Sequence, residues 1–197
     1  MSANLVRIGG GLAAMLGGLL GVIASLVIFV FVVPSALSQT SSQMPSSSII
    51  ILTGVLLILT WVLVSGGLVG LYESQREAVG ELGVVSFVMA LVGSILLVIV
   101  VSIQTFNIGV SGGAVMLAAV IAVLVASIGW FLFGLATYRA RIYPRAAAIL
   151  LMVGAAINLL IHFSAAESIV MEAAIAWLGF FLFRGRTSSG EDPMHVR

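Results

Sequence analysis

Long apolar stretches alternate with short polar segments along the whole chain. A membrane-spanning helix needs about 20 mostly apolar residues. Six stretches reach that length or come within one residue of it: 8–33, 48–72, 82–102, 114–138, 144–163 and 165–183. The pattern predicts an all-α integral membrane protein, with a bundle of six transmembrane helices as one domain over 1–183 and a polar cytoplasmic tail over 184–197.

The composition supports a lipid environment and excludes several kinds of chemistry. Hydrophobic residues make up 61% of the chain and charged residues 8%, whereas soluble domains are about 25% charged. A net charge of +1 and the absence of lysine argue against binding to nucleic acid. The absence of cysteine excludes disulfides, thiolate metal sites and cysteine nucleophiles. We therefore predict neither a metal nor a cofactor.

The arginines predict the orientation in the membrane. Cytoplasmic flanks of membrane helices are enriched in basic residues. With six spans, both termini, the second loop and the fourth loop lie on one side. That side holds every arginine of the chain: Arg7, Arg76, Arg139, Arg141, Arg145, Arg184, Arg186 and Arg197. We expect both termini in the cytoplasm.

The first apolar stretch has an alternative interpretation as a cleaved signal peptide. The segment "SALSQ" (35–39) resembles a small-residue cleavage site. A signal core has about 7–15 apolar residues, and the stretch here is longer, which favours a retained helix. Cleavage near residue 38 would leave five spans with the same later topology.

Small residues recur every four positions in the first stretch. The main stripe is Gly9, Ala13, Gly17, Gly21 and Ser25, and a neighbouring stripe is Gly10, Ala14 and Gly18. Gly66 and Gly70 repeat the spacing in the second stretch. In lipid, small residues allow helix backbones to approach closely. The stripe predicts a packing face, directed at the second helix, a protein partner or another copy of the chain. The alternative is that glycine is simply common in membrane helices.

Polar residues gather around the fifth and sixth stretches. Asn158 and His162 are four residues apart and share a helix face. Glu167 opens the sixth stretch, and Glu172 follows one and a half turns later. A charge at the centre of a membrane helix costs about 2.5–3.5 kcal/mol. One hypothesis is a proton or cation site made of Glu172 and His162. The alternative is a hairpin whose polar residues reach the outer lipid headgroups.

Charged residues of the second and fourth loops, which lie on the side that holds the arginines, form a second group. Glu73, Glu77 and Glu81 recur every four residues, and Arg76 can pair with Glu73. The other loop carries Arg139, Arg141 and Arg145. These side chains would form a docking patch or a gate of ion pairs between the loops. The alternative is two solvated loops whose arginines set the topology.

Two loop motifs resemble a known group of proteins. They are Gly70, Leu71 and Gln75 in "GLVGLYESQ", and Arg139, Ala140, Pro144 and Arg145 in "YRARIYPR". The last two thirds of the chain resemble small multi-span membrane proteins of the actinobacterial and Chloroflexi type. The resemblance implies a bacterial plasma-membrane protein and carries no activity with it.

The function expected from the sequence is non-enzymatic. The chain has no HExxH, GxSxG or Walker motif. We expect a structural or accessory membrane protein, such as a subunit of a larger complex. The alternative is a transporter or channel for a small solute, a proton or a cation, using Glu172 and His162. A short similarity between segments 70–76 and 134–139 also favours that alternative, because transporters often contain repeats.

Overall fold

The computed structural model describes residues 3–32, 47–106, 112–160 and 165–185. Within these ranges the chain is helical apart from short turns. The helices are α1 (Ala3–Val27) with a π-helical turn η1 (Ile28–Val32), α3 (Ser47–Phe106), α4 (Gly112–Ala140), α5 (Arg145–Leu160) and α6 (Ala165–Arg184). The prediction of an all-helical protein is confirmed for this part of the chain.

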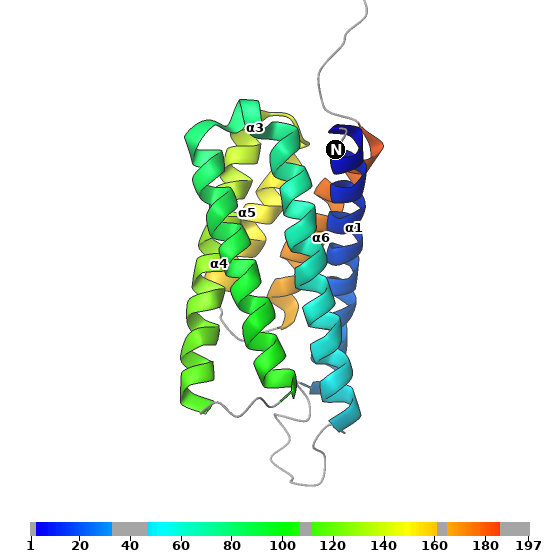
Figure 1. The fold of residues 1–197 in the computed structure, drawn as a ribbon, viewed down its shortest axis with the longest axis vertical. Coiled ribbons are helices and arrows are strands. Elements are labelled where there is room, and N and C mark those ends of the chain that lie inside the picture. The colour runs from blue at the N-terminus through cyan, green and yellow to red at the C-terminus, as the bar shows by residue number, and fades with distance from the viewer. Residues whose placement is uncertain (1–2, 33–46, 107–111, 161–164, 186–197) are drawn as a thin grey trace, which may run out of the picture.

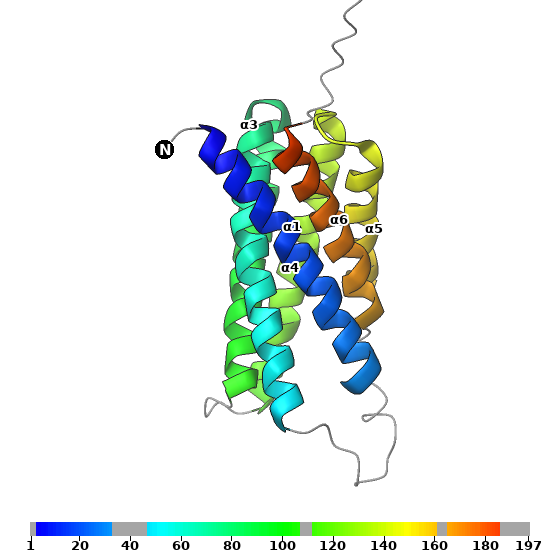
Figure 2. The same cartoon turned by 90° about the vertical axis from the view of Figure 1, so that its right-hand side faces the viewer.

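The helices lie side by side as an elongated bundle (Figure 1). Element α3 consists of two helices that meet at Gly80, where the chain folds back on itself. The start of α1, the bend of α3 and the turn between α4 and α5 lie at the same end of the bundle (Figure 1). Helix α1 crosses one face obliquely, between α3 and α6 (Figure 2).

Three of the described helices are long and apolar enough to cross a membrane. They contain the segments Leu5–Val30, Ser48–Phe106 and Gly112–Ala140, and the second of these includes the bend at Gly80. Large apolar side chains are exposed on every helix, including Leu19, Ile51, Leu117, Ile149 and Phe180. Such a surface is compatible with a membrane protein because lipid tails solvate it.

The helix before the bend is longer than the sequence pattern predicted. The expected span ended at residue 72, but the helix continues to the bend through Glu73, Arg76 and Glu77. Glu, Gln, Arg and Ala favour helices, so this charged segment continues the helix beyond its apolar part. Glu81 lies beyond Gly80, on the second arm, and therefore does not extend a continuous row of glutamates.

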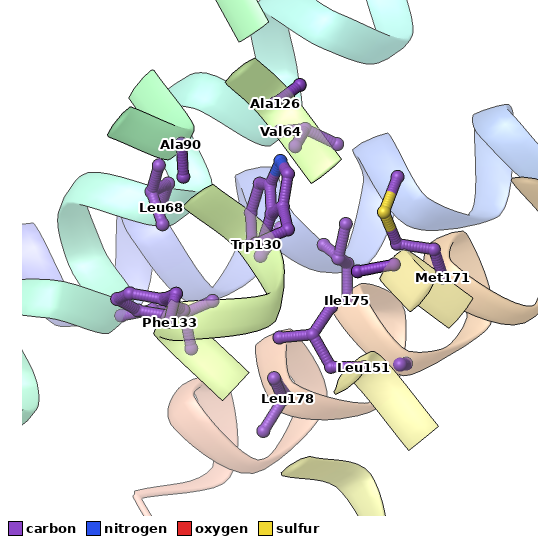
Figure 3. Packing of buried hydrophobic residues seen from close by; sticks show 14 of the residues in the cluster. Val64, Leu68, Ala90, Ala126, Trp130, Phe133, Leu151, Met171, Ile175 and Leu178 are labelled. Carbon is purple, nitrogen blue, oxygen red and sulfur yellow. The ribbon is translucent and has the colours of Figure 1, made fainter. Parts of the chain in front are cut away.

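The interior of the bundle is built around two aromatic side chains of α4. Trp130 and Phe133 are fully buried, and their rings meet edge to face with centroids 5.9 Å apart. In Figure 3, Leu68 and Ala90 of α3 lie on one side of Trp130, and Met171 and Ile175 of α6 lie on the other. Leu151 of α5 and Leu178 of α6 belong to the same cluster. The cluster also contains Ala14 of α1, so every α-helix of the bundle contributes to one core.

Glycines bring the helix backbones into direct contact. A Cβ atom placed on Gly129 of α4 would lie 2.3 Å from the backbone nitrogen of Ala90, and one on Gly93 would lie 2.4 Å from the Cα of Ala126. Between α5 and α6, a Cβ on Gly154 would lie 2.7 Å from the Met171 nitrogen. In lipid this close approach maximises van der Waals contact, which is the main attraction between helices.

Candidate functional site

Glu172 lies inside the bundle, at the contact between α6 and α1. Only 2% of its surface is exposed. The Ser25 hydroxyl of α1 donates a hydrogen bond of 3.0 Å to the Glu172 Oε2 atom. Glu172 therefore does not point outward from the bundle, as the alternative of a hairpin whose polar residues reach the headgroups expects of it. The neighbouring helix covers the carboxyl group before it can reach the surface.

Two glycines of α1 make room for this glutamate. A Cβ atom on Gly21 would lie 2.5 Å from the Glu172 Cδ and 2.7 Å from its Oε1. A Cβ on Gly18 would lie 2.5 Å from the carbonyl oxygen of Glu172 and 2.6 Å from the Ala176 nitrogen. Gly18 thus allows the two backbones to approach, and Gly21 leaves the space that the carboxyl group fills.

Thr60 of α3 belongs to the same region through the register of α1 and α3. Gly67 contacts Ala14, and Gly17 contacts Val64. One further turn along each antiparallel helix leads to Gly21 on α1 and to Thr60 on α3. Thr60 is 1% exposed, and its hydroxyl has no hydrogen-bond partner among the described residues. The side chains shown to meet beside Gly21 are Ser25 of α1 and Glu172 of α6.

Asn158 lies in a different interface from Glu172. Its Nδ2 atom donates a hydrogen bond of 3.0 Å to the Ser127 hydroxyl, between α5 and α4. Glu172 faces α1 instead. The expected grouping of these two residues is not seen, because they lie on faces turned toward different helices. His162 and the side chain of Glu167 lie outside the described residues.

The small-residue face of α1 is divided between two neighbours. Gly17 meets Val64 of α3, whereas Gly21 and Ser25 meet Glu172 of α6. Gly66 would place a Cβ 3.8 Å from that of Ala13. Gly9 differs from the expectation, since it is exposed and a Cβ there would meet nothing within 4 Å. The contact expected of it is made by Gly10, whose backbone packs against Gly70.

A polar cluster occupies the end of the bundle near the bend of α3. Gln75 is 1% exposed and donates a hydrogen bond of 3.0 Å from Nε2 to the Thr137 hydroxyl. The hydroxyl groups of Ser74 and Tyr143 are 2.6 Å apart. Burial raises the pKa of the Tyr143 phenol to about 12. Sequence reasoning did not find these pairs, because each joins positions more than 60 residues apart.

The charged loop residues at the same end are mostly solvent-exposed. Arg76 lies 3.9 Å from Glu73 on its own helix, with 66% and 46% of the two side chains exposed. The Arg145 guanidinium lies over the Tyr138 ring at 5.9 Å. Glu77, Glu81, Arg139 and Arg141 are also exposed. An open cavity of about 520 Å³ lies beside Glu73, Gln75 and Glu77. The observed ion pair contributes little to stability, because exposed pairs give only about 0–1 kcal/mol.

Among the described residues, the polar groups of the interior are a carboxyl group, amides, hydroxyls and the indole N–H of Trp130. Within the described ranges, no three His, Asp or Glu side chains come together in a way that could hold a metal ion. The Glu172 site can exchange a proton or accept hydrogen bonds. No protein-family model, curated protein or solved structure matches the chain.

Proposed function

We propose that the chain is a six-span protein of a bacterial plasma membrane, with both termini in the cytoplasm. The two arms of α3 supply two spans, and α1, α4, α5 and α6 supply the others. The arginines that lie within the described ranges support this orientation. Arg7, Arg76 and Arg145 lie near the start of α1, the bend of α3 and the start of α5, which share one end of the bundle (Figure 1).

Cysteine labelling tests this orientation, because the natural chain has no cysteine. Ala78 lies beside the bend, and Gly113 lies at the start of α4, toward the other end (Figure 1). Both residues are exposed. A membrane-impermeant maleimide added to whole cells should label Gly113→Cys. It should label Ala78→Cys only after the membrane is opened. The reverse pattern, or equal labelling, would contradict the proposed topology.

The function that the geometry supports best is a structural or accessory role as a subunit of a membrane complex. The observation that carries this proposal is the packing of the interior. In the described residues, glycines let the helix backbones touch, and apolar side chains fill the space between the helices. Gly9 adds to it, because this small residue of the α1 stripe points away from its own bundle. A partner helix or a second copy can approach the backbone closely at that position.

The size of the protein in mild detergent tests the subunit role. The natural protein, extracted from its native membrane, should migrate as an assembly larger than one chain. Gly9→Leu should reduce it to the single-chain size, because the side chain would block a partner without disturbing the bundle. Gly113→Leu is the matched control, since a Cβ there also meets nothing within 4 Å. A natural protein that migrates as one chain, or a Gly9→Leu variant that stays assembled, would contradict the proposal.

A second candidate function is transport of a proton, a cation or a small solute through a pathway that includes Glu172 and His162. The burial of Glu172 against Ser25 favours it, because ionisable residues inside membranes usually serve ion pathways. Liposomes with an imposed pH gradient and an internal pH dye would measure proton flux. Glu172→Gln should abolish the flux, and Glu73→Gln, at an exposed carboxylate, should preserve it. Equal flux in both variants, or none in the natural protein, would exclude this function.

A further inference from the structure

Among the described residues, the surroundings of Glu172 contain hydroxyl groups but no counter-charge. Segments 8–72, 82–138, 146–166 and 173–183 contain no Asp, Glu, Lys or Arg, and His162 lies outside the described residues. On α1 the charged residue is Arg7, which lies near Gly185 at the cytoplasmic end. The charged residues of α3 lie around its bend, and α4 and α5 carry theirs at that end too. On α6 itself, Arg184 is twelve residues away and Glu167 is five residues away.

A buried carboxylate in this position has no cation among the described residues that would offset its loss of hydration. Buried charges in proteins are paired, bound to a metal or neutralised by a proton. The hydroxyl of Ser25 reaches Oε2. The other oxygen, Oε1, lies over Gly21. Thr60 lies one helical turn from Val64, which Gly17 contacts, and its hydroxyl has no hydrogen-bond partner among the described residues. This unpartnered hydroxyl is the candidate to accept a hydrogen bond from a protonated Oε1.

We propose that Glu172, Ser25 and Thr60 form a membrane-embedded proton-binding site at the junction of α1, α3 and α6. In the proton-bound state the Glu172 acid donates from Oε1 to Thr60, while Ser25 donates to Oε2. Release of the proton to water leaves the carboxylate, and the Thr60 hydroxyl then turns to donate to it, since a hydroxyl can act in either direction. This inference rests on the proposal that α6 crosses the membrane. It holds whether or not the protein binds a partner or carries a proton flux.

The position of the site along α6 indicates where the proton exchanges. Glu172 is seven residues from the start of α6 at Ala165 and twelve from its end at Arg184. At 1.5 Å per residue, these separations are about 10 Å and about 18 Å. The shorter route leads to the end opposite the cytoplasmic arginines, so the site exchanges its proton with the outer side.

Infrared spectroscopy and carbodiimide labelling of the protein in liposomes test the site directly. The natural protein should show the carbonyl stretch of a neutral carboxylic acid in an apolar environment, and Glu172→Gln should lose this band. A hydrophobic carbodiimide should modify Glu172, and raising the external pH should abolish the modification. A band that persists in Glu172→Gln would overturn the proposal. Protection of Glu172 by sodium ions at constant pH would also overturn it, because the site would then bind a metal cation.

The role of Thr60 is tested with closely matched variants. Thr60→Val keeps the shape of the side chain and should shift the acid band to the frequency of a carbonyl with fewer hydrogen bonds. Thr60→Ser should keep the natural frequency. Thr53 is the control, because it is another buried threonine of α3 with no hydrogen-bond partner among the described residues. Thr53→Val should leave the band unchanged, and equal bands in the two valine variants would overturn the assignment of Thr60. These measurements detect the proton-binding site even if the protein shows neither proton flux nor assembly with a partner.

Discussion

Gly10 of α1 and Gly70 of α3 touch backbone to backbone. A Cβ atom on Gly10 would lie 2.5 Å from the Cα of Gly70, and the reverse substitution would give 2.6 Å. The preceding residue of α1, Gly9, is exposed, and a Cβ atom there would meet nothing within 4 Å. Two adjacent glycines therefore have opposite roles, because successive residues of a helix point about 100° apart.

This pair predicts a sharp difference between two alanine substitutions. Gly10→Ala should destabilise the bundle by about 1–3 kcal/mol, the usual cost of overpacking a tight contact. Gly9→Ala should be neutral or slightly stabilising, since alanine favours a helix over glycine. Unfolding in mixed detergent micelles, followed by circular dichroism, measures both changes. Equal stability of the two variants would contradict the backbone contact.

The bend of α3 predicts an effect that comes from backbone conformation alone. Gly80 has φ 56° and ψ −154°, a region that only glycine occupies readily. A Cβ atom there would meet nothing within 4 Å, so steric contact with other residues adds no cost. Gly80→Ala should therefore lower the free energy of unfolding by about 1–3 kcal/mol. Gly113→Ala is the control, as an open helical glycine, and should not destabilise the protein in the same unfolding experiment.

The hydrogen bond between Gln75 and Thr137 predicts a cost for losing one hydroxyl. The Oε1 atom of Gln75 is already without a partner among the described residues. Thr137→Val would leave the Nε2 group unpaired too and should destabilise the protein by about 1–3 kcal/mol. Thr137→Ser keeps the hydroxyl and should retain most of the stability. Thermal unfolding of the purified protein distinguishes them, and two variants of equal stability would show that the bond contributes nothing.

Tyr143 predicts a loss of stability at high pH. Burial raises the pKa of its phenol from 10.0 to about 12 in the folded protein, despite the opposing effects of Ser74 and Arg7. Below pH 10.0 the phenol is neutral in both the folded and unfolded states. Between 10.0 and about 12 the unfolded state loses the proton first, so stability falls across this window by at most about 3 kcal/mol.

Absorbance of tyrosinate measures this titration. The natural protein should show a component with a midpoint near pH 12, and Tyr143→Phe should lack it. The variant should also lose less stability than the natural protein as the pH rises through the same window. A late component that persists without Tyr143 would assign the raised pKa to another group.

The helical class could be predicted from the sequence because it depends on local properties. Apolar stretches of the right length, interrupted by polar segments, indicate membrane helices wherever their neighbours lie. The end of the helix at Gly80 was less predictable, since the charged segment before it favours a helix as readily as a loop. The orientation inferred from the arginines stays a prediction.

The partners of individual side chains were decided by the tertiary structure alone. The helices are apolar on nearly every side, so their periodicity does not show which face meets which neighbour. The sequence therefore grouped Glu172 with Asn158 and His162, which are close along the chain, whereas the fold places Ser25 of α1 against it. It likewise favoured Gly9 where the fold uses Gly10. In lipid, the fit of small residues between particular pairs of helices makes that choice, and this fit exists only once the helices are packed.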